Sequence, residues 1–540
     1  KYELFLNAQA TYMEYTENWG INRPTQALVD DRLYQTGVNA GAPIAPLPGA
    51  IVVPANAVGP NSQNTASVDG NGFVPGPLVK IDRRLRLLAP GDNSMARNFK
   101  LQGIQTVSID PDTRLVNNNL FTYTRRETFS SYYYSEIVDP SYTAQSRWEY
   151  QKKIDDHDLN AGLDFQYRNV SAYSDYGFEP ANAWDITRDR SQINAYGSQA
   201  FQNSFIDGNA FVPGIQPPTR LPVPGYSNRF FNTNNFGGDG NESYSATVAP
   251  FIQGSYQVTD SLKAISGARA DFIHVNTKIP VSGPEDSESV VNPNLNFSLV
   301  HKTTSKLSTY GTYNYSENTA GAEGNGGGYI PDADPNTGVY GSLNKDSLQT
   351  PAELFEVGAK YAAFDGKLFL GAAAYHQTFT RRPPGSNGTE YDFKGLEFEA
   401  NYQPNKNFYA TASYGAIDGS VSSTFDLISF TGTGETRVAG LPKHQFNTLV
   451  SYTFDNGFGA SLGGRLHSEM KNDNDGTVII PWQFELDGSV FYTYKNWTAR
   501  LTILNLTDEW NFSPPNEFYG KGSILLEPGV RGEFTMAYKF

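Results

Sequence analysis

Hydrophobic and polar residues alternate along many segments of this chain. In residues 443–454 one row of alternate positions holds Phe446, Thr448, Val450, Tyr452 and Phe454, and the residues between them are mostly polar. Successive side chains of a strand point to opposite faces, so a period of two predicts a strand with one apolar and one polar face. The tripeptide Asp-Asn-Gly at 455–457 then predicts a tight hairpin turn, and residues 458–470 repeat the alternation.

The unit of strand, short turn, strand and long loop recurs along the whole sequence. We expect about 18 strands. They are placed at 2–17, 98–110, 114–136, 142–155, 158–174, 242–258, 261–276, 290–302, 306–316, 352–364, 366–379, 392–404, 407–419, 443–454, 458–470, 481–494, 496–506 and 529–540. The longest irregular segments are 18–97, 176–241, 317–350 and 421–442.

Because short turns and long loops alternate between the strands, the predicted sheet has two different ends, one with short turns and one with long loops. Outer-membrane barrels have short periplasmic turns and long extracellular loops, so we expect an all-β, transmembrane antiparallel barrel. No run of about 18 apolar residues offers a transmembrane helix. A soluble β-propeller or a tandem of β-sandwiches is the alternative fold, but a propeller would show a repeat of roughly 40–50 residues, and none is visible.

Composition agrees with a barrel that has a polar lumen. Hydrophobic residues are 39% of the 540 residues, yet aromatic residues reach 14%, with 33 Tyr and 34 Phe. Alternating lipid-facing and lumen-facing residues produce such a modest average hydrophobicity. The final segment, 529–540, ends the chain on an apolar row that we expect to face lipid: Phe534, Met536, Tyr538 and Phe540.

Charge and reactive residues exclude several functions. The net charge of −15 disfavours nucleic acid as a partner. The chain has no Cys, and its six His residues are scattered without metal-ligand spacing. No nucleophile or phosphate-loop motif is present, so we predict neither an enzyme nor a cofactor. Asp473 and Asp475 are weak Ca²⁺ candidates, because their spacing lacks the Glu of a calcium-binding loop.

Five segments resemble the barrel of TonB-dependent outer-membrane receptors, specifically the siderophore receptors. The similarity includes a Pro-Lys-His phrase entering a late strand, an E-x-G-x-K hairpin and an Asn-Leu-x-Asp strand exit. The five segments are 2–31, 352–379, 391–418, 439–454 and 501–512. They follow the order expected in the family and span nearly the whole chain.

The resemblance implies a barrel of 22 strands with a plug inside it. The first strand here resembles the family's fifth, so we expect residues 1–540 to form the barrel domain without the plug and without the first four strands. A self-contained 18-strand barrel is the alternative. It would require residues 2–15 to pair with residues 534–540, because a closed barrel has no free edge.

The family implies active uptake of a scarce, large ligand, first of all a ferric siderophore. Energy would come from the TonB–ExbB–ExbD complex acting on the plug. Other expected partners are the barrel-assembly machinery, which would read the C-terminal row ending at Phe540, and the lipids and lipopolysaccharide of a Gram-negative-type outer membrane. A passive porin-like channel and a structural or adhesive barrel remain alternatives.

Arginine and tyrosine clusters are the candidate ligand contacts, because ferric siderophores are bulky and often anionic. Tyrosines also form the aromatic girdles of membrane barrels, and arginines also stabilise loops or bind lipid headgroups, so each cluster has a structural alternative. The candidates are Tyr132, Tyr133, Tyr134, Arg381, Arg382, Arg83, Arg84 and Arg86.

Overall fold

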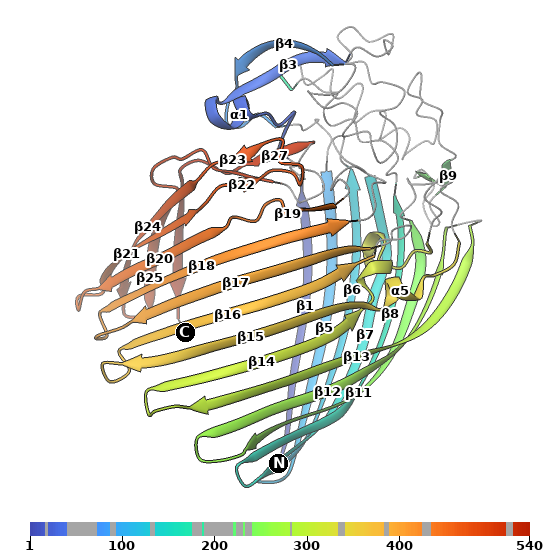
Figure 1. The fold of residues 1–540 in the computed structure, drawn as a ribbon, viewed down its shortest axis with the longest axis vertical. Coiled ribbons are helices and arrows are strands. Elements are labelled where there is room, and N and C mark those ends of the chain that lie inside the picture. Colours follow the sequence, from blue (N-terminus) through green and yellow to red (C-terminus); the bar gives the residue numbers. More distant parts are fainter. Residues whose placement is uncertain are drawn as a thin grey trace.

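The computed structural model contains one large antiparallel sheet of 19 strands that curls around a central lumen (Figure 1). It describes residues 1–16, 20–39, 73–86, 93–129, 135–174, 186–187, 220–222, 230–232, 240–280, 283–332, 341–382, 388–423, 434–514 and 522–539. The strands of the large sheet are β1 (Tyr2–Tyr15), β5 (Asn93–Asp110), β6 (Thr113–Phe129), β7 (Ser135–Ile154), β8 (His157–Ser174), β11 (Asn241–Gln257), β12 (Leu262–Lys278), β13 (Glu285–Lys302), β14 (Leu307–Asn318), β15 (Thr350–Ala363), β16 (Leu368–Arg381), β17 (Thr389–Tyr402), β18 (Phe408–Ser423), β19 (Gly434–Arg437), β20 (His444–Thr453), β21 (Phe458–His467), β24 (Gln483–Tyr494), β25 (Trp497–Leu504) and β28 (Arg531–Tyr538).

Each of the predicted strands corresponds to one of these elements, and β19 is an additional short strand. Neighbours in the sheet follow chain order, as in β20–β21, where Phe446 pairs with Leu466 across a tight turn. Gly457 in that turn has φ +87°, a conformation that favours glycine. Sequential hairpins therefore build this sheet, which we call the wall. Short turns join the strands at one end of the wall, the turn end, and long connections join them at the other, the loop end (Figure 1).

Strands β1 and β28 are the two edges of this sheet. β1 pairs with β5 and β28 pairs with β25, and among the described residues no ladder joins β1 to β28. Both edges are exposed along their length, with Leu6 at 67% and Phe534 at 69% of full exposure. The ladder that a closed 18-strand barrel needs is thus absent from the part of the chain that the structure describes.

The outer face of the wall is apolar and carries two aromatic belts. At the loop end, rings on six neighbouring strands from β5 to β12 form a chain with centroid separations of 5.9–6.4 Å. This loop-end belt consists of Phe99, Phe121, Tyr142, Tyr167, Tyr244 and His274. At the turn end a second belt includes the pairs Tyr402–Phe408 and Trp497–Tyr538. Aromatic girdles of this kind mark the two membrane interfaces of outer-membrane barrels.

The apolar row of the last strand lies on this outer face. Phe534 pairs with Leu501, and Met536 pairs with Ala499, both in the outward row of β25. The predicted orientation of Phe534, Met536 and Tyr538 toward lipid is therefore consistent with the register. Phe540 lies outside the described residues.

The inner face is polar, and its aromatic rings lie over glycines of the neighbouring strand. Five such pairs are directly opposite each other in the ladders: Phe251–Gly162, Tyr310–Gly358, Tyr375–Gly395, Phe393–Gly419 and Phe491–Gly459. At Gly358 an added Cβ would lie 2.6 Å from the Tyr310 ring. Glycine is required at this position because the ring occupies the space of a side chain.

Short elements in the loops form small sheets of their own. They are β2 (Ile21–Asn22), β3 (Leu33–Asn39), β4 (Phe73–Lys80), β9 (Arg220–Pro222), β10 (Phe230–Asn232), β22 (Met470–Lys471), β23 (Ile479–Ile480), β26 (Phe512–Ser513) and β27 (Ser523–Leu526). The described helices are α1 (Gln26–Asp31), η3 (Ala320–Ala322), η4 (Asn325–Gly327) and α5 (Lys345–Leu348). None of the described helices is long and apolar enough to cross a membrane.

Candidate functional site

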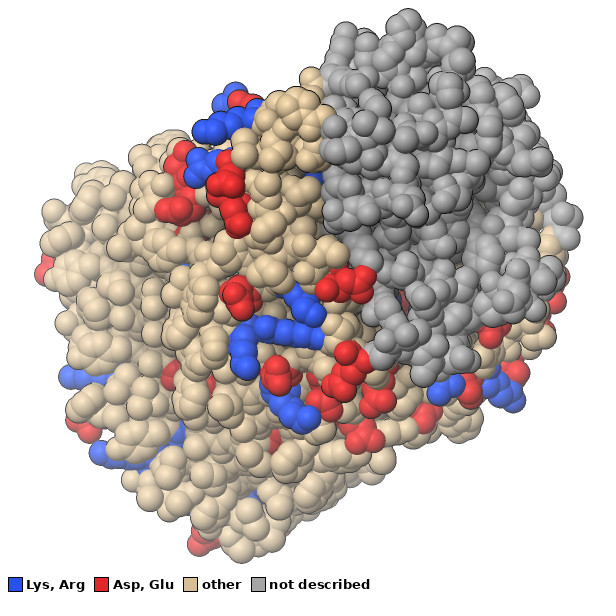
Figure 2. All heavy atoms as spheres, turned by 45° about the horizontal axis from the view of Figure 1, so that its top comes forward, with Lys and Arg blue, Asp and Glu red and all other residues tan. Residues whose placement is uncertain are grey.

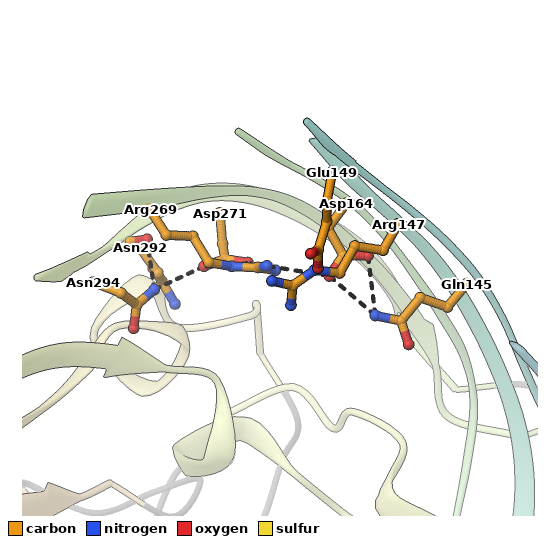
Figure 3. A network of polar contacts seen from close by, with 8 residues as sticks. All are labelled: Gln145, Arg147, Glu149, Asp164, Arg269, Asp271, Asn292 and Asn294. Atoms are coloured by element: carbon orange, nitrogen blue, oxygen red, sulfur yellow. Dashed lines mark hydrogen bonds and ion pairs between the residues drawn. The ribbon is translucent and has the colours of Figure 1, made fainter. Parts of the chain in front are cut away.

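A network of charged and amide side chains crosses the inner wall of β7, β8, β12 and β13 (Figure 3). At its centre Arg269 binds Asp164 at 3.1 Å and Asp271 at 2.6 Å. Gln145 donates to both oxygens of Asp164 at 3.0 Å, and Asn294 donates to Asp271 at 2.7 Å. Asp164 is only 6% exposed, so its charge depends on these donors. The network fixes four strands and presents oriented polar groups to the lumen.

Arg147 belongs to the same surface. Its guanidinium pairs with Glu149 on the same strand and lies 4.4 Å from the centre of the Phe251 ring on β11. The Phe251 ring in turn covers Gly162, where an added Cβ would be 2.7 Å from the ring. Arginine, ring and glycine therefore form a stack that spans β7, β8 and β11.

An acidic hollow lies on another part of the inner wall, formed by β14 to β18 and β20. Its volume is about 380 Å³, and Glu356, Glu397 and Glu399 contribute carboxylates to its lining. Tyr310 donates to Glu356 at 2.6 Å, and the Lys360 ammonium lies 5.7 Å from the centre of the Tyr310 ring. Three carboxylates against one ammonium make this hollow suitable for a cationic group inside the lumen.

The connection between β14 and β15 folds into the mouth of the barrel rather than outward. Residues 319–332, the inner segment, lie against the lumen faces of β7, β8, β11 and β12. The amide of Tyr329 donates to Ser243 at 3.0 Å, and Thr277 donates to the carbonyl of Tyr329. Glu323 approaches Arg168 at 3.9 Å.

Glycines allow this close approach. A Cβ at Gly326 would lie 3.1 Å from Val138 and from Val170, and a Cβ at Gly328 would overlap Asn241. Gly326 and Gly327 also have positive φ, at +66° and +73°. The backbone of the inner segment therefore lies directly on the wall.

The end of the same connection is anchored in the same way. Asn292 donates to the carbonyl of Leu348 at 2.9 Å, and the amide of Leu343 donates to Asp286 at 2.7 Å. A small apolar core seals the contact between wall and connection. It consists of Val275, Val290, Ala322, Tyr329, Leu343 and Leu348.

At the loop end the first connection of the chain contacts two late connections, the one between β21 and β24 and the one between β25 and β28. Ile21 of β2 pairs with Ile524 of β27, and Gln26 exchanges hydrogen bonds with Ile479. Arg83 hydrogen-bonds Asp508 and lies 5.0 Å from the centre of the Trp510 ring, and Arg32 lies 4.7 Å from the same ring. We refer to these contacts between residues 20–86 and residues 470–530 as the clasp.

The predicted arginine contacts divide into engaged and available side chains. Arg83 is held in the clasp, and Arg86 donates to the carbonyls of Arg83, Leu85 and Leu526. Burial lowers the pKa of Arg86 from its ordinary value. The guanidinium of Arg84, by contrast, is exposed and has no polar partner among the described residues.

The remaining predicted contacts are placed as follows. Arg382 binds Asp346 of α5 at 2.7 Å, and Arg381 is exposed at the end of β16. The three tyrosines Tyr132, Tyr133 and Tyr134 lie outside the described residues. Figure 2 shows that charged side chains gather near the loop end, with wide uncharged areas on the wall beside them.

The predicted Ca²⁺ residues lie in the turn after β22. Asp473 is buried, and its carboxylate accepts hydrogen bonds from the amide and hydroxyl of Thr477. Asp475 is exposed. Within the described ranges no group of three or more His, Asp or Glu side chains has the geometry to hold a metal ion.

Residues 81–506 match the family model described as TonB dependent receptor-like, beta-barrel. The chain belongs to this family. Its members are outer-membrane proteins, and they are transport receptors rather than enzymes. The match covers most of the chain and includes the strands that form the polar network, the acidic hollow and the inner segment.

Solved structures show the same receptor barrel. The ferric-catecholate import receptor Fiu from E. coli K12, in its closed form, aligns over 100% of this chain and 72% of its own, with a TM-score of 0.66 and 12% identity. The siderophore receptor PiuA from Acinetobacter baumannii aligns over 100% and 72%, with a TM-score of 0.63 and 14% identity. The copper transporter OprC aligns over 84% and 67%, with a TM-score of 0.57 and 13% identity. Among curated protein sequences, none matches this chain.

Sequence reasoning placed the strands of the receptor barrel but missed the inner segment and the network. The Gly-Asn-Gly-Gly-Gly run at 324–328 is a signal for close backbone approach, yet residues 317–350 were expected to form an irregular loop. The network could be found only by assigning which alternate residues face the lumen, which requires the register of four strands.

Proposed function

We propose that this protein takes up a scarce, large ligand across the outer membrane, with a ferric siderophore as the ligand and TonB–ExbB–ExbD as the source of energy. The observation that carries the proposal is the likeness of the complete described barrel to siderophore receptors such as Fiu and PiuA. At 12–14% identity this likeness supports a shared fold only. The identity of the ligand is therefore argued from the chemistry of the mouth and the lumen.

An exposed arginine at the loop end suits the capture of an anionic complex. The exposed guanidinium of Arg84 is available for charge-assisted hydrogen bonds to carboxylate or catecholate oxygens. Bidentate arginine contacts are directional, so they favour ligands with paired oxygens. We assign Arg84 as a ligand contact, whereas Arg83 and Arg86 support the loop that carries Arg84.

In this proposal, energy coupling requires a lumen-filling domain inside the barrel. The acidic hollow offers Glu356, Glu397 and Glu399 to cationic side chains of such a domain. The Arg269 network offers a second polar surface on strands away from the hollow. These two surfaces are the proposed contacts of a plug that responds to TonB.

Uptake of radioactive iron tests this function. Iron-limited cells that carry the protein should accumulate ⁵⁵Fe supplied as a panel of catecholate and hydroxamate siderophores, and a proton uncoupler should stop accumulation. The Arg84→Gln variant should bind its ligand about tenfold more weakly, which corresponds to the loss of one charge-assisted contact. Lys345→Gln is a matched control, because Lys345 pairs with Glu288 of the wall at 3.4 Å. Cells lacking the protein that accumulate every siderophore normally would rule out the proposal.

A passive channel is the second candidate, and the inner segment is the observation that favours it. A loop folded against the inner wall narrows a lumen without closing it, and barrels of 16–18 strands commonly leave an aqueous channel. Uptake that persists in the presence of the uncoupler and rises linearly with solute concentration would support the channel over the receptor.

A further inference from the structure

The outward face of the wall between the two aromatic belts is apolar on nearly every described strand. Its positions hold aliphatic, aromatic, Gly or Pro residues, apart from isolated hydroxyls such as Ser266 and Thr448. β5, β6 and β7 differ, because four outward polar residues come together there. This amide cluster consists of Gln105, Asn117, Asn119 and Ser146.

Strand register places the cluster inside the apolar band. Gln105 pairs with Asn117, and Asn119 pairs with Gly103 on one side and Ser146 on the other. Side chains that pair directly across a ladder share one face. On β5, the outward neighbours of this region are Leu101 and Val107, which are 46% and 39% exposed.

The hydrogen bonds of the cluster are incomplete. Asn119 donates to Asn117, which donates to the hydroxyl of Ser146 at 3.3 Å and to the carbonyl of Arg147 at 3.2 Å. Asn117 is only 5% exposed, and both its amide nitrogen and its amide oxygen have hydrogen-bond partners. Gln105 is exposed, and its amide makes no hydrogen bond to any residue that the structure describes. One N–H of Asn119 and the whole amide of Gln105 therefore point to the membrane.

Unpaired amides in hydrocarbon are costly, because lipid chains offer no hydrogen-bond partner. Polar side chains of this kind join neighbouring protein segments inside membranes. We propose that the amide cluster is a lateral contact between two copies of this chain in the outer membrane.

The chemistry of the cluster favours a second copy as the partner. A carboxamide carries both donors and an acceptor, so a patch of amides can pair with the identical patch across a two-fold axis. The cluster carries no charge that would require an oppositely charged partner.

Cysteine cross-linking tests the contact directly. The protein contains no Cys, so Gln105→Cys introduces a single thiol. Mild oxidation of outer membranes should then give a disulfide-linked pair with twice the mass of the chain. Leu295→Cys is the matched control, because Leu295 is a 50% exposed outward residue on β13. Equal cross-linking at the two positions, or a product with another protein, would overturn the proposal.

A second variant separates the contact from folding. The double substitution Gln105→Leu and Asn119→Leu should weaken the dimer at least about tenfold in lipid nanodiscs, measured by native mass spectrometry. Its heat-modified mobility in detergent gels should match that of the unaltered protein, because Leu suits a lipid-facing site. An unaltered protein that is monomeric in nanodiscs, or a double variant that dimerises equally well, would contradict the inference.

Discussion

The guanidinium of Arg83 lies 5.0 Å from the centre of the Trp510 ring, although the two residues belong to opposite ends of the chain. Arg32 lies over the same ring at 4.7 Å. The Trp510→Ala substitution removes both cation–π contacts, each worth about 0.5–2 kcal/mol. We expect faster limited proteolysis of residues 20–86 and little change in the melting temperature of the barrel. Trp482→Ala is a control, because Trp482 is 52% exposed and stacks with His444 on the outer face.

Acid should loosen the clasp at the contact between Arg83 and Asp508. The hydrogen bond from the amide of Val530 is the main cause that lowers the pKa of Asp508 below its ordinary value of 3.8, and Arg83 adds to the effect. The ionised carboxylate of Asp508 therefore stabilises the folded state fully at pH values above its ordinary pKa of 3.8. This stabilisation is lost as the pH falls through the lower pKa that Asp508 has in the folded protein. Tryptophan fluorescence and proteolysis should both report opening of the clasp in this acidic range. Asp508→Asn should abolish the pH dependence, and an unchanged acid response would contradict the assignment.

Arg269 is expected to be the most sensitive residue of the polar network. Arg269→Met leaves Asp164 with Gln145 as its remaining donor, and an unsatisfied buried group costs about 1–3 kcal/mol. Urea unfolding in detergent should show a lower midpoint. The double variant Arg269→Met, Asp164→Asn should lose less free energy of unfolding than the two single variants lose together. The reason is that the two side chains share one interaction. Additive losses would mean that the residues act independently.

Glycine at 358 is expected to resist substitution. In Gly358→Ala the new Cβ would lie 2.6 Å from the Tyr310 ring, and overpacking of this kind typically costs about 1–3 kcal/mol. Gly415→Ala is the control, because no atom lies within 4 Å of its Cβ position. The difference should appear as a lower unfolding temperature for the first variant alone, measured by heat-modified gel mobility.

The inner segment should detach when its closest glycine is enlarged. In Gly328→Val the side chain would overlap Asn241, whereas in Gly341→Val the nearest atom to the new Cβ is 3.7 Å away. We expect the first variant to expose the segment to added protease and the second to leave it protected. Equal protection of both variants would show that the segment adapts on the wall without leaving it.

The strands were predictable because their pattern depends only on which side faces lipid. Phe446, Val450 and Tyr452 alternate with polar residues in the sequence, and the register confirms that they share the outer face. The ladder between the two ends of the chain, the alternative considered for a closed barrel, is absent from the described residues, and the family assignment of the barrel is confirmed.

The functional details were less predictable, because they depend on contacts between distant segments. Arg83, Arg84 and Arg86 look alike in sequence, yet Trp510 and Leu526 engage two of them and leave Arg84 available. The contact of Gly326 with Val138 joins residues far apart in the chain, so no local pattern reveals it. The amide cluster appears only when three strands are aligned.

The pairing of Ile21 with Ile524 has a consequence for the order of assembly. The described ladders of the wall join strands that follow one another in the chain order of the sheet, so each can form as its strand is inserted, whereas this pairing lies in the loops outside the wall. The contact between Ile21 and Ile524 closes a loop of almost the entire chain, which carries the largest entropic cost of any pairing here. It can form only after β27, which carries Ile524, has reached the loop end, so protection of residues 20–39 from protease would mark a late step of folding in the membrane.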